Sequence, residues 1–427
     1  MDSNDSTDLS RSDVKTLALA ALGGALEFYD FIIFVFFTVV IGQLFFPPDT
    51  PDWLRQLQAY GLFAAGYLAR PLGGVVMAHF GDRSGRKRMF TLSVFLMAIP
   101  TLLIGLLPTY ASMGYAAPLA LLLLRLVQGA AIGGEVPGAW TFVAEHVPAR
   151  RVGFACGTLT AGLTIGILFG SLIATAVNKS LSPAEVLAYG WRIPFLVGGV
   201  FGFFAVFLRR LLAETPVFEE LRRRNELVRG LPLASVLRGH LRAVVVSMLL
   251  TWVLTAAIVV VILMTPTLIQ KLFAIAPADA LAANSIATLC LSIGCIAFGL
   301  AADRFGATRV FALGCTLLLA AVYALYFGLA ASVQWLVPLY AVAGFCVGVV
   351  GVIPTVLVRA FPPAVRFSGI SFAYNVAYAI FGGLTPLVVS LMMKSQPLAP
   401  AHYVAALCVV GIFVGLTQRD LGATAAR

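Results

Sequence analysis

The sequence predicts an all-α integral membrane protein whose twelve transmembrane helices form two pseudo-symmetric bundles of six. Three observations predict this fold class. Of the 427 residues, 60% are hydrophobic and only 11% are charged, whereas soluble proteins carry about 25% charged residues. Apolar runs of about twenty residues, the length that crosses a bilayer, recur along the whole chain. One polar segment near the middle divides these runs into two sets of six.

The apolar runs define the domain organisation. We place the spans near 16–44, 57–80, 89–108, 113–142, 152–177, 192–213, 241–269, 281–302, 309–330, 335–358, 367–393 and 401–418. They form an N-terminal bundle over 16–213 and a C-terminal bundle over 241–418, joined by a cytoplasmic linker over 214–240. Tails of residues 1–15 and 419–427 flank the bundles. The first tail lacks the basic segment of a secretory signal, so we expect the first span to be retained.

Lys and Arg are distributed unevenly between the two sides of the predicted bundle. With the N-terminus inside, the inner loops and tails hold Arg11, Lys15, Arg83, Arg86, Lys87, Arg88, Arg150, Arg151, Arg304, Arg309, Arg359, Arg366, Arg419 and Arg427. The central loop adds Arg209, Arg210, Arg222, Arg223, Arg224, Arg229, Arg238 and Arg242. The other side holds only Arg55, Lys179, Lys271 and Lys394, with Arg192 at a helix start. Because cytoplasmic loops are enriched in Lys and Arg, both termini are predicted to be cytoplasmic, in a bacterial inner membrane.

Composition also excludes several function classes. The net charge of +10 does not indicate nucleic-acid binding, because the basic residues lie between apolar runs rather than on a soluble face. The six cysteines have no CxxC spacing, and the four histidines are scattered near predicted helix ends, so we expect no metal, no cofactor and no enzymatic activity. The linker run EELRRRNELVRG forms either an amphipathic helix on the inner leaflet or a solvated connection, and its charge favours the connection.

A weak internal repeat supports the division into halves. The second span is followed by Gly81, Asp82, Arg83 and a basic run, and the eighth by Asp303, Arg304 and Gly306. A second echo joins 147–151 (VPARR) to 362–366 (PPAVR). Duplicated six-helix halves with a substrate site between them are typical of transporters that work by rocking one half against the other.

Five charged residues interrupt the apolar spans of the N-terminal half: Glu27, Asp30, Arg70, Arg125 and Glu135. Each costs roughly 2.5 to 3.5 kcal/mol at the membrane centre, and such residues mark ion or substrate pathways. The pattern therefore predicts a transporter of a polar or charged solute.

Glu27 and Asp30 are three residues apart and share one face of the first span. Low dielectric disfavours the charged form of a carboxylate, and a second carboxylate nearby disfavours it further. The pair is therefore suited to taking and releasing a proton, although a permanent ion pair to an arginine is the alternative.

The fourth span carries Arg125, Gln128, Ile132 and Glu135 along one stripe. Arg125 is a fixed positive charge, which either binds a substrate carboxylate, holds a coupling carboxylate ionised or forms a static bridge. Glu135 lies closer to the cytoplasm and is a candidate inner proton acceptor. Glycines 129, 133, 134 and 138 are expected to let another helix approach closely.

Two further residues of the N-terminal half have open assignments. Arg70 either pairs with an acid of the first or fourth span or contacts the substrate. Tyr29 either donates a hydrogen bond in the cavity or serves as packing.

The C-terminal half has no acidic or basic residue deep in a span. Any substrate contact there must be neutral, and the candidates are Trp252, Tyr374, Asn375 and Tyr378, together with Thr251, Thr255, Asn284 and Ser371. Aromatic stripes are more often core than ligand contact. This scarcity of cations argues against a grip on a tricarboxylate and favours a substrate with one negative charge or a zwitterion.

Seven short segments carry a combined signature: 27–31 (EFYDF), 70–74 (RPLGG), 81–83 (GDR), 125–129 (RLVQG), 133–135 (GGE), 191–195 (WRIPF) and 214–218 (ETPVF). Together they resemble the major facilitator superfamily, and more narrowly its branch of metabolite:proton symporters for citrate, other di- and tricarboxylates, shikimate, proline and betaine. They cover the N-terminal half densely, and the C-terminal half matches weakly. The resemblance implies the major facilitator fold and places Arg125 in the coupling apparatus.

The resemblance also implies a cytoplasmic gate. Asp82 with Arg83 and Arg86 would pair across the cytoplasmic mouth and face a helix N-terminus of the other half, and Asp303 with Arg304 would form its twin. Such contacts close the inner side and must break for the inward-open state.

The sequence and the resemblance together predict proton-coupled import of a small organic acid or zwitterion by alternating access, with Glu27, Asp30 and Glu135 as proton-coupling residues. Substrate, protons and the lipid bilayer are the expected partners, and the functional unit is expected to be a monomer. The alternatives are a proton-driven exporter of a metabolite or siderophore-like acid on the same fold, and a membrane sensor that does not transport. These motifs do not indicate the direction of transport.

Overall fold

The computed structural model describes residues 9–224, 226 and 231–417, and within them every regular element is helical. The N-terminal half comprises α1 (Arg11–Phe36), α2 (Thr38–Phe45), α3 (Asp52–Ser84), α4 (Arg86–Leu106), α5 (Tyr110–Met113), α6 (Ala116–His146), η1 (Ala149–Arg151), α7 (Val152–Ser180), α8 (Pro183–Glu185), η2 (Val186–Gly190) and α9 (Arg192–Arg210). Two short helices, α10 (Pro216–Arg223) and α11 (Pro232–Gly239), follow.

The C-terminal half comprises α12 (Leu241–Ala256), η3 (Ala257–Met264), α13 (Thr265–Phe273), α14 (Pro277–Phe305), α15 (Ala307–Ala331), η4 (Val333–Trp335), α16 (Leu336–Val347), η5 (Gly348–Val352), α17 (Ile353–Ala360), η6 (Pro363–Val365), α18 (Arg366–Ala377), η7 (Tyr378–Gly382), α19 (Gly383–Met392) and α20 (Ala399–Thr417). Twelve helical stretches among the described residues are long and apolar enough to cross a membrane, as the sequence predicts.

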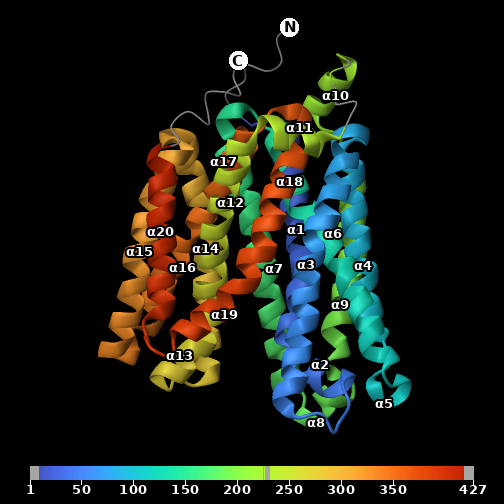
Figure 1. The fold of residues 1–427 in the computed structure, drawn as a ribbon, viewed down its shortest axis with the longest axis vertical. Coiled ribbons are helices and arrows are strands. Elements are labelled where there is room, and N and C mark those ends of the chain that lie inside the picture. Colours follow the sequence, from blue (N-terminus) through green and yellow to red (C-terminus); the bar gives the residue numbers. More distant parts are fainter. Residues whose placement is uncertain (1–8, 225, 227–230, 418–427) are drawn as a thin grey trace.

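The two halves stand side by side as separate bundles (Figure 1). Helices α1 to α9 form one bundle and α12 to α20 the other, while α10 and α11 lie together at one end of the molecule, which we call the linker end. The opposite end, which carries α5, α8 and α13, is called the far end. Across the boundary α3 and α6 pack on α18, and α7 packs on α14.

The first span differs from its expected bounds. A continuous helix was expected over 16–44, but α1 ends at Phe36 and α2 restarts at Thr38. The Thr38 hydroxyl donates to the carbonyl oxygens of Phe34 and Val35 at 3.2 and 2.8 Å. These bonds lie directly beside the break at Phe37 and occupy carbonyl oxygens at the end of α1.

Glycines set the contact between α3 and α6, as expected for the fourth span. A Cβ atom added at Gly129 would overlap the carbonyl group of Gly66, and one added at Gly133 would overlap that of Arg70. Small residues let helix backbones approach this closely. The same close packing fixes the depth at which the charged side chains of both helices meet.

The linker forms more secondary structure than expected. The charge run favoured a solvated connection, but α10 and α11 are helical, and Phe218 of α10 and Val236 of α11 are buried. Pro216 and Pro232 each stand at the first helical position, where a missing N–H costs nothing. Phe218 and Val236 therefore anchor the two short helices to the bundles, while the end of α10, with exposed Arg222 and Arg223, projects from the molecule (Figure 1). Residues 225 and 227–230 of the charge run lie outside the described residues.

Candidate functional site

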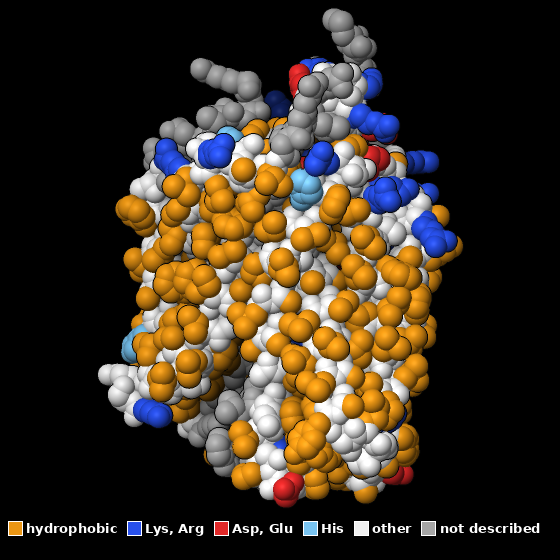
Figure 2. All heavy atoms as spheres, turned by 45° about the vertical axis from the view of Figure 1, so that its right-hand side comes forward, with side chains coloured by type: hydrophobic (Ala, Val, Ile, Leu, Met, Phe, Trp, Pro, Cys, Tyr) orange, Lys and Arg blue, Asp and Glu red, His pale blue; other side chains and the backbone are white. Residues whose placement is uncertain are grey.

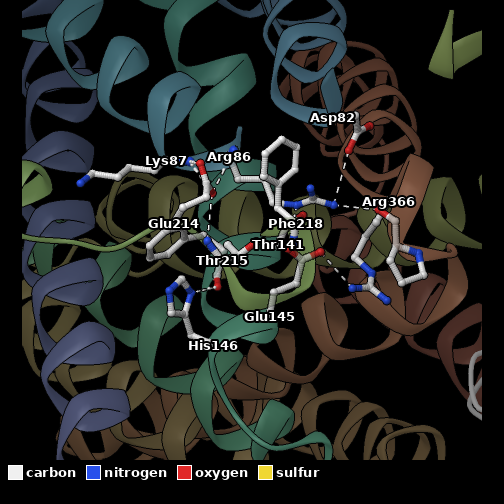
Figure 3. Close-up of polar contacts among 12 residues, drawn as sticks. Asp82, Arg86, Lys87, Thr141, Glu145, His146, Glu214, Thr215, Phe218 and Arg366 are labelled. Carbon is white, nitrogen blue, oxygen red and sulfur yellow. Dashed lines mark hydrogen bonds and ion pairs between the residues drawn. The ribbon is translucent and has the colours of Figure 1, made fainter. Parts of the chain in front are cut away.

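A network of four charged side chains joins the two bundles at the linker end (Figure 3), and we call it the latch: Asp82, Arg86, Glu145 and Arg366. Arg86 Nε lies 2.7 Å from Glu145 Oε2, and Arg86 Nη2 lies 3.6 Å from Asp82 Oδ1. On the other bundle, Arg366 Nη1 donates to Glu145 Oε1 at 3.0 Å.

Backbone groups of the C-terminal bundle complete the latch. The Ser368 N–H donates to Asp82 Oδ2 at 2.9 Å, and Arg86 Nη2 donates to the Pro363 carbonyl oxygen at 2.7 Å. Ser368 lies in the first turn of α18, whose free N–H groups favour a carboxylate. Buried charges are stable only when they are paired and hydrogen-bonded, so the latch holds the linker end closed.

The repeat of this contact in the other half is also formed. Asp303 at the end of α14 accepts hydrogen bonds from the N–H groups of Gly153 and Phe154 in the first turn of α7, at 2.7 and 2.8 Å. Arg359 adds a hydrogen bond from Nη2 to the Ala149 carbonyl oxygen at 3.0 Å. The two aspartates predicted as twins therefore occupy equivalent places, each on a helix N-terminus of the opposite bundle.

The two neighbouring arginines do not join these contacts. Arg83 and Arg304 are exposed. Arg83 Nη1 lies 3.3 Å from His79 Nε2, and the Arg304 guanidinium lies over Phe305 with 5.3 Å to the ring centroid. Among the described residues neither pairs across the bundles, because each side chain points out from its helix end.

Arg70 lies between the bundles near mid-membrane and is only 1% exposed. Its guanidinium carbon is 5.5, 5.4 and 4.3 Å from the ring centroids of Tyr67, Tyr374 and Tyr378. Its Nε donates to Asn375 Oδ1 at 3.3 Å, and its Nη2 has no hydrogen-bond partner among the described residues. Of the two alternatives for Arg70, the pairing with an acid of the first or fourth span is not formed, because tyrosine rings surround the cation instead.

Asn375 bridges the bundles at the same level. Its Nδ2 donates to the Gly133 carbonyl oxygen of α6 at 2.6 Å, while its Oδ1 accepts from Arg70 of α3. A Cβ atom at Gly74 would meet the Asn375 amide. Tyr67 and Tyr378 stack across the boundary with 5.5 Å between ring centroids, and the Thr164 and Ser292 hydroxyls share a hydrogen bond between α7 and α14.

At the far end the surface is hollowed between the bundles (Figure 2). The molecule is thus closed at the linker end and in the middle, and it opens toward the far end.

A second charged cluster lies inside the N-terminal bundle. Arg209 Nη2 donates to Glu27 Oε2 at 3.1 Å and to Glu135 Oε1 at 2.6 Å, and the Ser93 hydroxyl donates to Glu135 Oε2 at 2.6 Å. The prediction that Arg209 is a loop charge is wrong, because it is 0% exposed and lies within α9. Two carboxylates therefore share one guanidinium.

Asp30 lies apart from this cluster. It is fully buried, and neither carboxylate oxygen has a hydrogen-bond partner among the described residues. Its oxygens face Gly198 and Gly202 of α9, where an added Cβ would lie 2.5 and 3.1 Å away. Thr101 of α4 lies on the same side of the site, since it too contacts Gly198.

Arg125 and Gln128 connect to Thr101 by hydrogen bonds. Arg125 Nη1 donates to Gln128 Oε1 at 2.8 Å, and Gln128 Nε2 donates to Thr101 Oγ1 at 2.8 Å. The Arg125 guanidinium also stacks over Phe34, 4.2 Å from the ring centroid. The stripe predicted on the fourth span thus splits, with Arg125 and Gln128 directed to this relay and Glu135 to Arg209.

Two aromatic candidates lie away from the opening. The Tyr29 hydroxyl donates to the Pro194 carbonyl oxygen at 2.9 Å inside the N-terminal bundle, so Tyr29 acts as packing. Trp252 stacks on Phe381 at 4.2 Å and donates to the Tyr403 hydroxyl at 2.9 Å, all within the C-terminal bundle. Tyr374, Asn375 and Tyr378, in contrast, all contact Arg70.

Sequence reasoning missed several members of these sites: Tyr67, Ser93, Glu145 and Glu214, with Arg209 misplaced. Arg209 had a signal, since the expected span 192–213 already enclosed it. Glu214 accepts from the N–H groups of Arg86 and Lys87 at 3.2 and 3.1 Å, an interaction that joins residues far apart in sequence and leaves no local pattern.

Comparisons with a family model and with individual relatives indicate the same family. A family model described as Major Facilitator Superfamily matches residues 20–386. The chain is 33% identical over 411 residues to a putative proline/betaine transporter of Staphylococcus aureus strain COL, covering 94% of this chain and 87% of that one. It is 28% identical over 422 residues to the glycine betaine/proline/ectoine/pipecolic acid transporter OusA of Dickeya dadantii, with 95% and 83% covered.

Solved structures share the fold. The proton:xylose symporter XylE bound to 6-bromo-6-deoxy-D-glucose superposes with a TM-score of 0.79 at 17% identity, covering 96% of each chain. XylE from E. coli in a partially occluded inward-open conformation gives a TM-score of 0.71 at 17% identity, with 95% and 97% covered.

Proposed function

The chain belongs to the major facilitator superfamily, and the relatives that it matches are transporters and not enzymes. We propose that it imports a small zwitterion or organic acid together with protons. The observation that carries the proposal is that three carboxylates buried in the spans, Glu27, Asp30 and Glu135, have a single ion-pair partner among the described residues, Arg209. Glu27 and Glu135 share Arg209, and Asp30 has no partner among the described residues. An unpaired buried charge costs several kcal/mol, so the sealed site favours a bound proton.

A chain of hydrogen bonds beside Asp30 ends at a buried cation, Arg125. Asp30 and Gln128 both lie beside Thr101, and Gln128 leads to Arg125. Arg125 cannot lose its proton, so it attracts the ionised form of any carboxylate that comes near it. Substrate binding and helix movement would change the distance between Asp30 and this fixed charge, and thereby load or release the proton.

We take the linker end as the cytoplasmic side. Lys and Arg side chains gather at that end of the molecule (Figure 2), and positive residues favour the cytoplasmic face. In this orientation the latch closes the cytoplasmic mouth while the opening faces outside. The conformation then corresponds to the outward-facing state of an alternating-access cycle, in which an importer receives its substrate.

The substrate we propose is a zwitterion with one carboxylate, and Arg70 is its anchor. The free Nη2 of Arg70 would take the carboxylate, since charge-assisted bonds from guanidinium to carboxylate are strong. The faces of Tyr67, Tyr374 and Tyr378 suit a methylated ammonium group, which aromatic rings attract. Proline and betaine, for which the matched relatives are named, are zwitterions with one carboxylate.

Uptake into proteoliposomes tests the proposal. Radiolabelled glycine betaine, proline, citrate, succinate, shikimate and lactate are offered with and without an inward proton gradient. A gradient worth 100 mV supplies about 2.3 kcal/mol, or roughly fiftyfold accumulation of one substrate. Accumulation of betaine or proline only with the gradient supports the proposal.

Two other outcomes separate the alternatives. Equal uptake with and without the gradient would contradict proton coupling. Uptake that appears only when the interior is acidic, so that protons leave as substrate enters, would identify a proton-driven exporter running in reverse.

A further inference from the structure

A groove of about 650 Å³ lies on the outer surface of the N-terminal bundle at the linker end, between α4 and α9. It is separate from the opening between the bundles. Its lining residues are Lys87, Arg88, Met89, Thr91, Leu92, Phe95, Val206, Arg210 and Glu214.

The groove is basic at one end and apolar along its length. Lys87 and Arg88 stand in the first turn of α4, and Arg210 ends α9, so three cations meet at the linker end. Leu92 and Phe95, 40% and 41% exposed, follow along α4, and Phe95 lies about 12 Å along the helix from Lys87. An anionic head above apolar tails matches this order of charge and hydrocarbon.

One carboxylate, Glu214, also borders the groove, but backbone donors compensate its charge. Its oxygens accept from the N–H groups of Arg86, Lys87 and Thr215 at 2.9 to 3.2 Å. The basic side chains remain available. Lys87 Nζ contacts only the Arg210 carbonyl oxygen, at 3.4 Å, and no described carboxylate pairs with Lys87, Arg88 or Arg210.

The groove faces away from the latch. Figure 3 shows Arg86 directed into the latch while its neighbour Lys87 extends in the opposite direction. A second groove at the linker end, between α12 and α20, has about 450 Å³ but a single cation, Arg242, in its lining. Charge therefore distinguishes the α4–α9 groove from its counterpart.

We propose that the α4–α9 groove binds one anionic phospholipid of the cytoplasmic leaflet, with the phosphate against Lys87, Arg88 and Arg210 and an acyl chain along Leu92 and Phe95. Basic pockets between membrane helices on the cytoplasmic side bind anionic headgroups in this way. The bound lipid would hold the first turn of α4 to the end of α9, beside the helix that carries Arg86.

Native mass spectrometry of the purified full-length chain in detergent tests this. Dioleoylphosphatidylglycerol, dioleoylphosphatidylcholine and inorganic phosphate are titrated separately. We expect one phosphatidylglycerol to bind at least tenfold more tightly than phosphatidylcholine, and phosphate not to displace it at equal concentration. The variant Lys87→Gln/Arg88→Gln/Arg210→Gln should weaken phosphatidylglycerol binding at least tenfold.

A matched variant controls for general surface charge. Arg222→Gln/Arg223→Gln/Arg224→Gln removes three exposed cations at the same end, outside the groove, and should leave binding unchanged. Leu92→Trp keeps every charge but fills the groove, and it should weaken binding even if the triple groove variant fails to fold. Equal losses in both triple variants, no preference for phosphatidylglycerol, displacement by phosphate alone, or unchanged binding in Leu92→Trp would each overturn the proposal.

Discussion

Loss of the Arg86 guanidinium should open the linker end of this transporter. Arg86 is 1% exposed, and its three contacts reach Asp82 and Glu145 of its own bundle and the Pro363 carbonyl oxygen of the other. In the Arg86→Ala variant both carboxylates stay buried in the closed state but can reach water in the open one. Breaking a buried pair costs about 3 kcal/mol.

That cost falls on the closed conformation alone. At about 1.4 kcal/mol per tenfold change, the ratio of open to closed molecules rises about a hundredfold. The readout is a cysteine at Ser368, which is 4% exposed beneath the latch, in a background whose native cysteines are replaced by alanine. A membrane-impermeant maleimide is applied from the linker side in inverted vesicles, and the labelling rate follows the open population.

Arg83→Ala is the matched control, because Arg83 is an exposed cation of the same segment whose described contact is His79. Its labelling rate should stay within about twofold of the parent, as surface charges contribute little. Equal rates in the Arg86→Ala variant and the parent would refute the assignment of Arg86 to the latch.

Three further predictions concern the packing and the charged clusters. Arg209→Gln leaves two buried carboxylates without their cation and should lower the free energy of unfolding by about 3 kcal/mol, measured by thermal denaturation in detergent. Adding Glu135→Gln should recover part of this loss. An unchanged stability of Arg209→Gln would contradict the sharing of one guanidinium by two carboxylates. Gly74→Leu places a side chain against Asn375 and Ser371 of the other bundle and against the Gly133 carbonyl group of α6. It should abolish uptake, raise labelling from the linker side and lower the thermal stability; normal uptake would show that the bundles need not approach there. Tyr378→Ala removes the ring nearest the Arg70 guanidinium and should raise the KM for uptake about tenfold, whereas Tyr378→Phe should stay within about twofold; equal effects of both variants would assign the role to the hydroxyl.

The fold could be predicted from the sequence because hydrocarbon imposes a simple rule. Each span must satisfy its backbone internally and cover about 30 Å, so length and hydropathy locate the helices to within a few residues. The break at Phe37 could not be predicted in this way, because the apolar run continues across it without a charged or helix-breaking residue.

The site was predictable only in part. Five candidates could be identified because a charge inside an apolar span is unfavourable in free energy and is retained mainly where it has a function: Glu27, Asp30, Arg70, Arg125 and Glu135. Their partners come from helices distant in the chain, and packing alone decides them. Arg70 therefore meets tyrosines instead of an acid.

Arg209 is a second case in which the sequence does not reveal the surroundings of a charged side chain. It stands beside Arg210 near the end of a span, and charge alone does not tell the two apart. Position around the helix does, because Arg209 turns toward the bundle interior while Arg210 is exposed. Arg83 and Arg86 divide in the same way between solvent and latch.

Proton movement on addition of substrate tests the central claim most directly. Proteoliposomes enclosing a pH-sensitive dye, with no imposed gradient, receive external glycine betaine or proline, and the internal pH is followed. The account predicts that the interior becomes acidic as substrate enters, and that Asp30→Asn abolishes this acidification while the protein stays folded. Entry of labelled substrate with no change of internal pH would contradict coupling of transport to protons.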